Sequence, residues 1–333
     1  MKAAYVSALG DADSIRYGEL PDPVPLPAQA RVRVLAVAVN AVDTFVRSGR
    51  WPTAVSFPLV VGRDLVGTID AVGPGVQRLA PGQLVWTNSA GYDGRPGATA
   101  ELVAVDQDRL YPLPPDADPV SFVAAAHPGA TAHGALIHRA RLQAGECVAV
   151  AGANGAVGMC LIQTAAAQRA EVIAVIRDPR SADRLRALGA THIVVADAGH
   201  APDAVAEAAG GGIDVFIDAS GHIDPADVIE QLNPRGRIIL IAGRGRTNLD
   251  RWRLYTREAQ LLGFIMSAMT ASELAAAAHW INHRPADRRL SVSIGSVLRF
   301  PDAARAHSMI ENSKLPRMPD GTVGRVVLQP SRG

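Results

Sequence analysis

The sequence predicts an α/β protein of two domains, one with a doubly wound parallel sheet of six strands and the other mostly β. Three observations support this fold class. A glycine-rich turn joins an apolar strand to an apolar helix near the middle of the chain, and short apolar runs alternate with alanine-rich stretches after it. The region before the turn is instead divided by Pro and Gly. The 333 residues, 48% of them hydrophobic, suffice for two buried cores.

The region up to about residue 110 has the pattern of a mostly β domain. Its strand-like runs are RVRVLAVAV, LVGTIDAVG and ELVAV. The proline cluster PDPVPLP, residues 21–27, is expected to be an extended surface connection. A second cluster, PLPPDADP at 112–119, marks the passage into the next domain, so we expect the first domain to cover 1–122 and the second 123–266.

The stretch CVAVAGANGAVGMCLIQTAAA, residues 147–167, carries the clearest chemical signal. Its glycines permit a sharp turn, leave room for a pyrophosphate and let the helix pack closely on the strand. The helix N-terminus would then direct free N–H groups at the phosphates. Because Ala153 replaces the first glycine of G-x-G-x-x-G, the motif alone also fits a tight turn in an unrelated α/β domain. The expected dinucleotide contacts are Gly152, Asn154, Gly155, Ala156, Val157 and Gly158.

The alternation after this turn favours the dinucleotide site. Gly189 is placed to stop the helical stretch SADRLRALGA, and Asp224 is placed to cap PADVIEQLN before Pro225. Together with the strand at 147–151, the later apolar runs predict six buried parallel strands joined by crossover helices. These runs are 171–176, 192–195, 214–218, 237–242 and 261–266.

After Met266 the chain returns to helix, strand and loop. It ends in GRVVLQP, a strand too short to form a domain alone. We therefore expect 267–333 to complete the first domain.

Bulk composition excludes several classes of protein. A net charge of +1, from 33 basic and 32 acidic residues, gives no footprint for nucleic acid or an anionic membrane. No apolar run approaches about 18 residues and no signal-peptide core is present, so we expect a cytoplasmic protein. Cys147 and Cys160 cannot supply the four thiolates of a structural zinc site, so we expect buried, inert thiols.

The order of these parts resembles the medium-chain dehydrogenase/reductase superfamily, and within it the zinc-independent quinone oxidoreductases related to zeta-crystallin. The resemblance covers nearly the whole length and rests on several motifs in the same order. It implies a GroES-like catalytic domain beside the nucleotide-binding domain. Besides the glycine loop, the motifs are MKAAYV at the start, AVNAVDTFVRSG at 38–49, VGRDLVGTIDAVGPGV at 61–76, TAHGALIHRARLQAGE at 131–146 and GRIILIAGRG at 236–245.

The resemblance also implies that no catalytic metal is bound. Zinc alcohol dehydrogenases of the superfamily have a cysteine ligand where this chain has Asn40, and the histidine of G-H-E where it has Arg63. An amide and a guanidinium cannot replace thiolate and imidazole on Zn²⁺. His127 falls close to the third ligand position, but one imidazole cannot hold a metal. His127 is then either packed before Pro128 or a polar group of the substrate pocket.

Without zinc, the chemistry implied is hydride transfer from a nicotinamide to a quinone or an α,β-unsaturated carbonyl compound. The protein must position the cofactor, exclude water and stabilise charge on the acceptor oxygen. Asn40 is either an amide donor to substrate or cofactor, or a side chain that bonds the loop backbone. Asp43 is expected to brace the same loop, against Arg47.

Relatives often carry tyrosines around the substrate pocket, and this chain departs from them. Phe45, Trp51 and Leu59 occupy the corresponding places, so a less polar pocket is expected. Trp51 either stacks on a flat acceptor or forms plain wall. The catalytic candidates are therefore Asn40, Phe45, Trp51 and His127.

Cofactor choice depends on the end of the second strand of the nucleotide domain, where an acidic residue would bond the 2′-hydroxyl of NAD. Ile176 stands there, and Arg177 and Arg180 follow as cationic partners for a 2′-phosphate, so NADPH is expected. The alternatives are that both arginines are solvated surface residues, or that Asp178 bonds the ribose in a shifted register. The resemblance adds Thr131 toward the nicotinamide, and Ala242, Gly243 and Arg244 toward the ribose end of the cofactor.

A small-molecule acceptor and a second copy of the chain are the expected partners. Relatives commonly pair through the edge of the nucleotide sheet, where 261–266 forms an apolar edge strand. Two other functions stay open. One is an enoyl-thioester or biosynthetic enone reductase, and the other is a nucleotide-binding protein with little turnover.

Overall fold

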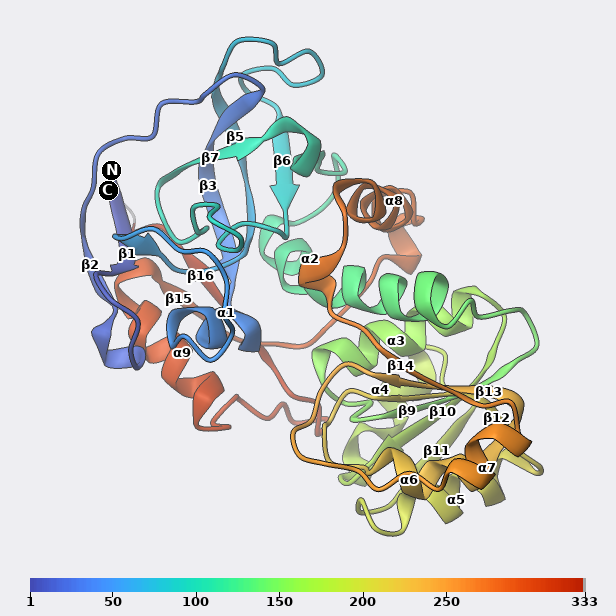
Figure 1. Ribbon diagram of the computed structural model, residues 1–333. Coiled ribbons are helices and arrows are strands. Elements are labelled where there is room, and N and C mark those ends of the chain that lie inside the picture. The colour runs from blue at the N-terminus through green and yellow to red at the C-terminus, as the bar shows by residue number, and fades with distance from the viewer. Residues whose placement is uncertain (332–333) are drawn as a thin grey trace. The chain divides into compact units, whose positions relative to one another are not determined.

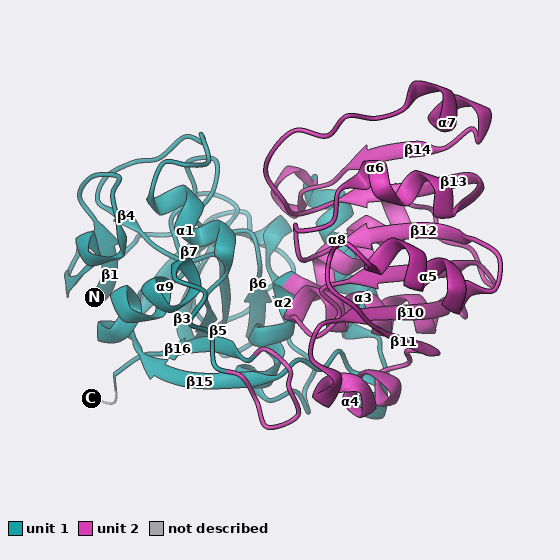
Figure 2. Ribbon diagram, turned by 90° about the horizontal axis from the view of Figure 1, so that it is seen from below, with its two compact units in different colours: residues 1–127, 270–316, 324–333 teal, residues 128–269, 317–323 magenta. Residues whose placement is uncertain are grey.

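The computed structural model describes residues 1–331 (Figure 1), so the last two residues of the predicted segment 267–333 lie outside it. The chain forms two compact units, shown in different colours in Figure 2. Unit 1 contains 1–127, 270–316 and the chain from 324, and unit 2 contains 128–269 and 317–323. The sequence predicts borders after 122 and 266. The short segment 317–323, which the sequence groups with the first domain, lies with unit 2.

Unit 2 is built on a six-stranded sheet in the order β11-β10-β9-β12-β13-β14, with every neighbouring pair parallel. Figure 1 shows α3 and α4 on one face of this sheet and α5 and α6 on the other. The predicted doubly wound sheet is therefore confirmed. Its strands are β9 (Cys147–Ala151), β10 (Glu171–Ile176), β11 (His192–Val195), β12 (Ile213–Asp218), β13 (Leu232–Leu240) and β14 (Gln260–Gly263). Its helices include α3 (Ala156–Ala167), α4 (Ala182–Ala187), α5 (Ala201–Ala209), α6 (Pro225–Val228) and α7 (Arg251–Thr256).

Local residue chemistry sets the ends of these elements. Gly189 adopts a φ of +111° just after α4, where an L side chain would be strained. The Asp224 side chain accepts a hydrogen bond from the Ala226 N–H at the start of α6, with Pro225 as the first helical residue. Strand β14 ends at Gly263, three residues earlier than the predicted strand, because the chain turns into a short 3₁₀ helix, Met266–Ala268.

Unit 1 is mostly β, as predicted. One sheet has the order β15-β16-β3-β5-β6-β8 with β7 also paired to β3, and a second has the order β2-β1-β4. The predicted C-terminal strand, β16 (Arg325–Gln329), pairs antiparallel with β3 of this unit. The remaining strands are β1 (Lys2–Val6), β2 (Arg16–Glu19), β3 (Gln29–Ala38), β4 (Leu59–Val60), β5 (Asp64–Val72), β6 (Leu84–Thr87), β7 (Leu102–Asp106), β8 (Tyr111–Pro112) and β15 (Ile294–Arg299).

Four helices accompany these sheets: α1 (Ala41–Arg47), α2 (Pro119–His133), α8 (Ala271–Asn282) and α9 (Ala303–Glu311). Helix α2 begins in unit 1 and continues into unit 2. Helix α1 is tied to α9 by Arg47, whose buried guanidinium pairs with Glu311 and donates to the Gly10 carbonyl at 2.8 Å. Within residues 1–331, no helix combines the length and the apolar character needed to cross a membrane.

The two cysteines behave as predicted. Cys147 and Cys160 are both free and buried, and burial raises the pKa of the Cys147 thiol to about 12. A thiol with so high a pKa is not a nucleophile at neutral pH.

Candidate active site

The glycine loop of unit 2 closes through contacts that leave no room for side chains. Gly152, directly after β9, has a φ of +71°, in the left-handed region. A Cβ atom on Gly158 would lie 2.3 Å from the Gly152 carbonyl oxygen. These two glycines therefore allow the first turn of α3 to sit directly against the end of β9, as the sequence predicts.

Gly155 leaves the start of α3 open. It is the N-cap residue, with extended backbone, and a Cβ atom there would meet only the Gly152 carbonyl oxygen, at 3.4 Å. Ala156 and Val157 begin the helix, where N–H groups have no acceptor within the helix. An open N-terminus of a 12-residue helix, with no side chain above it, fits the pyrophosphate of a dinucleotide.

The end of β10 supplies cations beside this loop. Ile176 is the last strand residue and is buried, and the exposed Arg177 follows it. The Asp178 carboxylate accepts from the Arg180 N–H at 3.1 Å and pairs with the Arg180 guanidinium at 2.6 Å. This guanidinium holds the pKa of Asp178 below its usual value. Asp178 is thus occupied by Arg180, whereas no ion pair of Arg177 is seen in the described part of the chain.

A segment that sequence reasoning missed lies along this edge of unit 2. In residues 317–323, the Val323 N–H donates to the Asn154 carbonyl at 3.0 Å, and Asn154 Nδ2 donates to the Gly321 carbonyl at 3.2 Å. A Cβ atom on Gly321 would lie 3.0 Å from the Arg180 Cβ. The segment therefore braces both the glycine loop and the turn after β10. Asn154 acts as a brace here, with its side-chain amide turned to Gly321.

The remaining cofactor candidates lie in two places within unit 2. Thr131 is buried in α2. Ala242, Gly243 and Arg244 are exposed in the loop after β13. This loop approaches the turn after β12 so closely that a Cβ atom on Gly221 would lie 2.5 Å from the Gly243 nitrogen.

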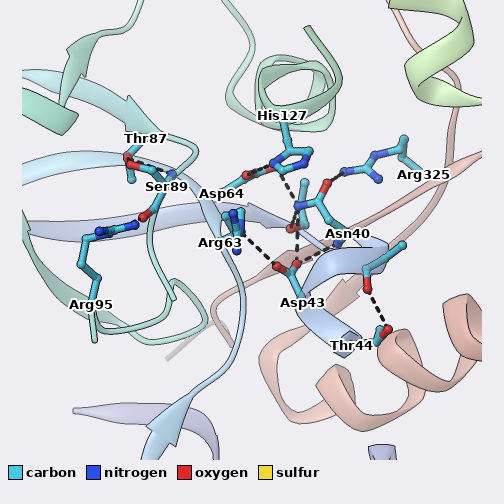
Figure 3. A network of polar contacts seen from close by, with 12 residues as sticks. Asn40, Asp43, Thr44, Arg63, Asp64, Thr87, Ser89, Arg95, His127 and Arg325 are labelled. Carbon is cyan, nitrogen blue, oxygen red and sulfur yellow. Dashed lines mark hydrogen bonds and ion pairs between the residues drawn. The ribbon is translucent and has the colours of Figure 1, made fainter. Parts of the chain in front are cut away.

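Unit 1 contains a buried polar network centred on Asn40 (Figure 3). The Asn40 main-chain N–H donates to Asp43 Oδ2 at 2.8 Å, and its Nδ2 donates to Asp64 Oδ2 at 2.9 Å. Its Oδ1 accepts from the Arg325 guanidinium at 2.7 Å. The side chain also bonds the backbone, because its Nδ2 donates to the Ala38 carbonyl at 3.4 Å, as in the second predicted alternative, and its other hydrogen bonds within unit 1 go to side chains.

Arg63 lies at the base of this network with only 1% of its side chain exposed. Its Nε is 3.8 Å from Asp43 Oδ1, and its guanidinium lies over the Tyr92 ring at 5.0 Å. Burial raises the pKa of Asp43 to about 7, although Arg63 and the Asn40 N–H oppose the rise. The predicted contact of Asp43 with Arg47 is wrong, because Arg47 points to α9 and pairs with Glu311.

His127 reaches the same network from α2. Its Nδ1 lies 3.6 Å from Asp64 Oδ1, and the Asp64 carboxylate is fully buried. Burial lowers the pKa of His127, while Asp64 acts in the opposite direction. The ring of His127 is therefore largely buried, as in the packed alternative, and it has a carboxylate partner in Asp64.

The aromatic candidates lie along α1 and the chain after it. Phe45 and Trp51 are both half-buried, and the main-chain N–H of Trp51 donates to the main-chain carbonyl of Phe45 at 3.1 Å. Trp51 packs against the hydrophobic core of unit 1. Leu59 belongs to that core itself, with 6% of its surface exposed.

The residues of the network do not fit a catalytic zinc ion. The Asn40 amide nitrogen faces a carboxylate as a donor, and Arg63 brings a guanidinium where a ligand would be needed. In residues 1–331, no group of three or more His, Cys, Asp or Glu side chains is arranged to hold a metal ion.

Two family models match this chain. Residues 26–115 match the "Alcohol dehydrogenase GroES-like domain" and residues 156–283 match the "Zinc-binding dehydrogenase" model. Rat quinone oxidoreductase is 29% identical over 297 residues, which cover 88% of this chain and 86% of the relative. The chain belongs to the medium-chain dehydrogenase/reductase superfamily, in its quinone oxidoreductase group. It is therefore an oxidoreductase.

Other relatives of this medium-chain dehydrogenase/reductase differ in their names. A 2-haloacrylate reductase from Burkholderia is 27% identical over 245 residues, covering 70% of this chain and 71% of the relative. A structure described as an NAD-dependent alcohol dehydrogenase has a TM-score of 0.86 and 28% identity, covering 99% of both chains. A mycobacterial protein solved in complex with NADPH has a TM-score of 0.84 and 28% identity, covering 99% of this chain and 100% of that one. The two solved structures share the fold of this chain, and their descriptions name NAD for one and NADPH for the other.

Proposed function

We propose that this chain is an NADPH-dependent, zinc-independent reductase of quinones or α,β-unsaturated carbonyl compounds. The observation that carries the proposal is the open N-terminus of α3 behind Gly152, Gly155 and Gly158, which fits a dinucleotide pyrophosphate. When bound, the reduced nicotinamide supplies a hydride. The rat quinone oxidoreductase supports a quinone as the acceptor.

The preference for NADPH rests on charge at the end of β10. Arg177 is exposed and Arg180 is 59% exposed, so both are accessible to a 2′-phosphate. Asp178 is paired with Arg180 and buried Ile176 carries no polar group, so the 2′-hydroxyl of NADH finds no free carboxylate there. The mycobacterial NADPH complex supports the same cofactor.

The unit 1 network is proposed to serve the acceptor. His127, held by Asp64, is the side chain that we assign to the acceptor oxygen, and Phe45 and Trp51 supply apolar wall. Asn40 positions Asp64 through its Nδ2 hydrogen bond. Reduction of a quinone or enone consumes one proton for each hydride, and an imidazole backed by a carboxylate suits that exchange.

The Burkholderia 2-haloacrylate reductase supports a conjugated carbonyl compound, rather than a quinone, as the acceptor. The second candidate function is an enoyl-thioester or biosynthetic enone reductase, which the same site could serve with a longer substrate. A nucleotide-binding protein with little turnover is the third alternative. We also propose a homodimer formed through β14, which is the edge strand of the unit 2 sheet.

The test is oxidation of NADPH and NADH with a panel of quinones, enones and enoyl thioesters. We expect turnover with quinones or simple enones and a higher kcat/KM for NADPH than for NADH. Turnover confined to enoyl thioesters would favour the enoyl-thioester reductase. NADPH binding without turnover on any acceptor would favour a nucleotide-binding protein with little turnover.

Zinc independence is tested separately by elemental analysis and chelation. We expect far less than one zinc per chain and unchanged activity after chelator treatment, because Asn40 and Arg63 are no ligands for Zn²⁺. About one zinc per chain, with activity lost on its removal, would overturn this part of the proposal.

A further inference from the structure

A pair of histidines lies at the C-terminal end of α8 in unit 1. His279 and His283 are four residues apart, so their side chains share one face of the helix. Their imidazole rings lie 3.9 Å apart between centroids, with 32° between the ring planes. Both residues are exposed, and neither belongs to the glycine loop or to the Asn40 network. The two rings are therefore open to a ligand from solvent.

Packing and capping hold α8 in place beneath these rings. The buried side chains of the helix are Leu274, Ala277, Ala278 and Ile281. At its start, the Thr270 N–H donates to the Glu273 carboxylate at 2.8 Å, and the Glu273 N–H donates to the Thr270 hydroxyl at 3.2 Å, which forms a capping box. Because the helix is fixed at both its core face and its N-terminus, the two histidines are presented from a rigid backbone.

The hydrogen bond of the His283 ring leaves one ring nitrogen available as a metal ligand. Its Nδ1 lies 2.8 Å from the His279 carbonyl oxygen. A carbonyl oxygen can only accept, so Nδ1 carries the proton and donates, and Nε2 of the neutral ring keeps its lone pair. Histidine ligands of metal ions are commonly oriented in this way, by a bond from the other ring nitrogen to a backbone carbonyl. Two other exposed histidines, His192 and His200, instead pair with carboxylates.

The surroundings of the pair accept a positive charge. The pair lies at the C-terminal end of a 12-residue helix, where the helix dipole favours cations. The cation next in sequence, Arg284, has its guanidinium over the Trp280 ring at 4.7 Å, and its Nε donates to the Arg288 carbonyl at 2.6 Å. The Arg284 side chain is therefore committed to partners other than the two imidazoles.

Two imidazoles select one class of ion. Imidazole nitrogen suits Cu²⁺, Ni²⁺ and Zn²⁺, whereas Mg²⁺, Ca²⁺ and Mn²⁺ prefer oxygen ligands. Two nitrogens at about 2.0–2.1 Å from one tetrahedral ion lie about 3.3 Å apart, which is close to the separation of these rings. The spacing is also that of the zinc-protease motif H-E-x-x-H, but Trp280 stands where that motif has its glutamate base. The pair is thus suited to binding an ion and not to hydrolysis.

We propose that His279 and His283 form a surface site for a divalent transition-metal ion. The ligands are Nε2 of His283 and a ring nitrogen of His279, and water completes the coordination. Cu²⁺ binds most tightly, and Ni²⁺ and Zn²⁺ bind more weakly. The site is distinct from the Asn40 network and does not depend on the proposed function. Zinc held by only two exposed side chains is removed by a chelator without loss of activity, so the test of zinc independence is unaffected.

The test is a calorimetric titration of Cu²⁺ into the full chain, without an affinity tag and without nucleotide. His279→Ala and His283→Ala should each weaken the tightest Cu²⁺ site about a hundredfold, because the second imidazole of a chelate binds intramolecularly. His200→Ala is the matched control, since His200 is 84% exposed and lies outside α8, and it should leave the affinity unchanged. Mg²⁺ should not bind at this site.

Electron paramagnetic resonance of the frozen Cu²⁺ complex counts the ligands. We expect nitrogen couplings from two imidazoles in the wild type and from one in either alanine variant, with thermal unfolding used to confirm that each variant folds. Unchanged Cu²⁺ affinity in both variants would place the ion elsewhere and overturn the proposal. A loss in only one variant would show binding by a single imidazole and would equally contradict it. Because no measurement uses NADPH or an acceptor, these outcomes are independent of the turnover assays.

Discussion

The glycine loop of unit 2 and the Asn40 network of unit 1 handle charge in opposite ways. The loop offers backbone N–H groups at an open helix end, and its cations, Arg177 and Arg180, stay exposed. The network buries Asp43, Arg63 and Asp64, each at most 5% exposed, and joins them to one another and to Asn40 through an ion pair and hydrogen bonds. Desolvated charges are stable only while each partner is in place, whereas a backbone cradle depends on the absence of side chains.

This difference implies different failures. A substitution in the loop should remove ligand binding because a new atom enters the cradle. A substitution in the network should reduce stability because a charge loses its partner. Four predictions follow, from the largest expected effect to the smallest. The first three test that division, and the fourth concerns a buried group of unit 1 outside the network.

The largest effect is expected from Gly158→Val. The new Cβ would lie 2.3 Å from the Gly152 carbonyl oxygen, so the backbone must shift. We expect NADPH binding to be lost and the free energy of unfolding to fall by about 3 kcal/mol, as measured by calorimetry and urea denaturation.

Gly155→Val is the matched control, since Gly155 has an ordinary φ of −84° and space around its Cβ. It should fold normally yet lose at least about a hundredfold in NADPH affinity, because a branched side chain stands over the helix N-terminus. Near-normal NADPH affinity in this variant would mean that the loop has another use.

Substitutions in the Asn40 network should lower the free energy of unfolding. Arg63→Met leaves the buried Asp43 carboxylate without its guanidinium, and we expect a loss of about 3 kcal/mol in the free energy of unfolding. The double variant Asp43→Asn, Arg63→Met removes both charges and should recover more than half of this loss. Urea denaturation of both proteins makes the comparison. Equal destabilisation of the two would show that packing by Arg63, rather than its charge, is what matters.

A smaller effect is expected at the exposed cations. Arg177→Ala should weaken NADPH about ten- to a hundredfold and leave NADH unchanged, because a charge-assisted contact to a phosphate contributes about 1.5 to 3 kcal/mol. Arg180→Ala should show a weaker effect of the same kind, because its guanidinium is already paired with Asp178. The measurement is kcat/KM for NADPH and for NADH, from steady-state kinetics of each variant and the wild type. Equal losses in kcat/KM for NADPH and NADH would indicate instead that Asp178 bonds the ribose of the cofactor in a shifted register.

The smallest effect concerns a buried neutral group of unit 1 outside the network. His307 is fully buried on α9, and burial together with Arg47 lowers its pKa to about 3 from the ordinary 6.5. The unfolded chain therefore binds the proton better, so stability is full above pH 6.5 and falls as the pH drops toward 3. With about 1.4 kcal/mol for each pKa unit, the loss is about 2 kcal/mol at pH 5.

His307→Leu provides the comparison for this pH dependence. Urea denaturation at pH 8 and pH 5 should show a smaller loss in the variant than in the wild type, by about 2 kcal/mol. Identical losses in both proteins would show that other groups determine the acid sensitivity.

The sequence was a good guide where the relevant contacts are local. The glycine turn, the caps at Gly189 and Asp224 and the alternating strands all depend on residues close together in the chain. The Asn40 network was not predictable in this way, because Arg325 lies 285 positions from Asn40 and no periodicity connects them. The choice of Arg47 as the partner of Asp43 failed for the same reason. Proximity in α1 suggested it, but long-range packing places Arg47 against α9.

The bracing segment 317–323 has a consequence for biosynthesis. A ribosome completes all six strands of the unit 2 sheet, which ends with β14 at Gly263, before it reaches residue 317. The glycine loop can therefore form with β9 and α3 while Asn154 still lacks its bonds to Gly321 and Val323. A nascent chain held at this stage should already fold the sheet, whereas the bonds of Asn154 to Gly321 and Val323 can form only after residues 317–323 have left the ribosome.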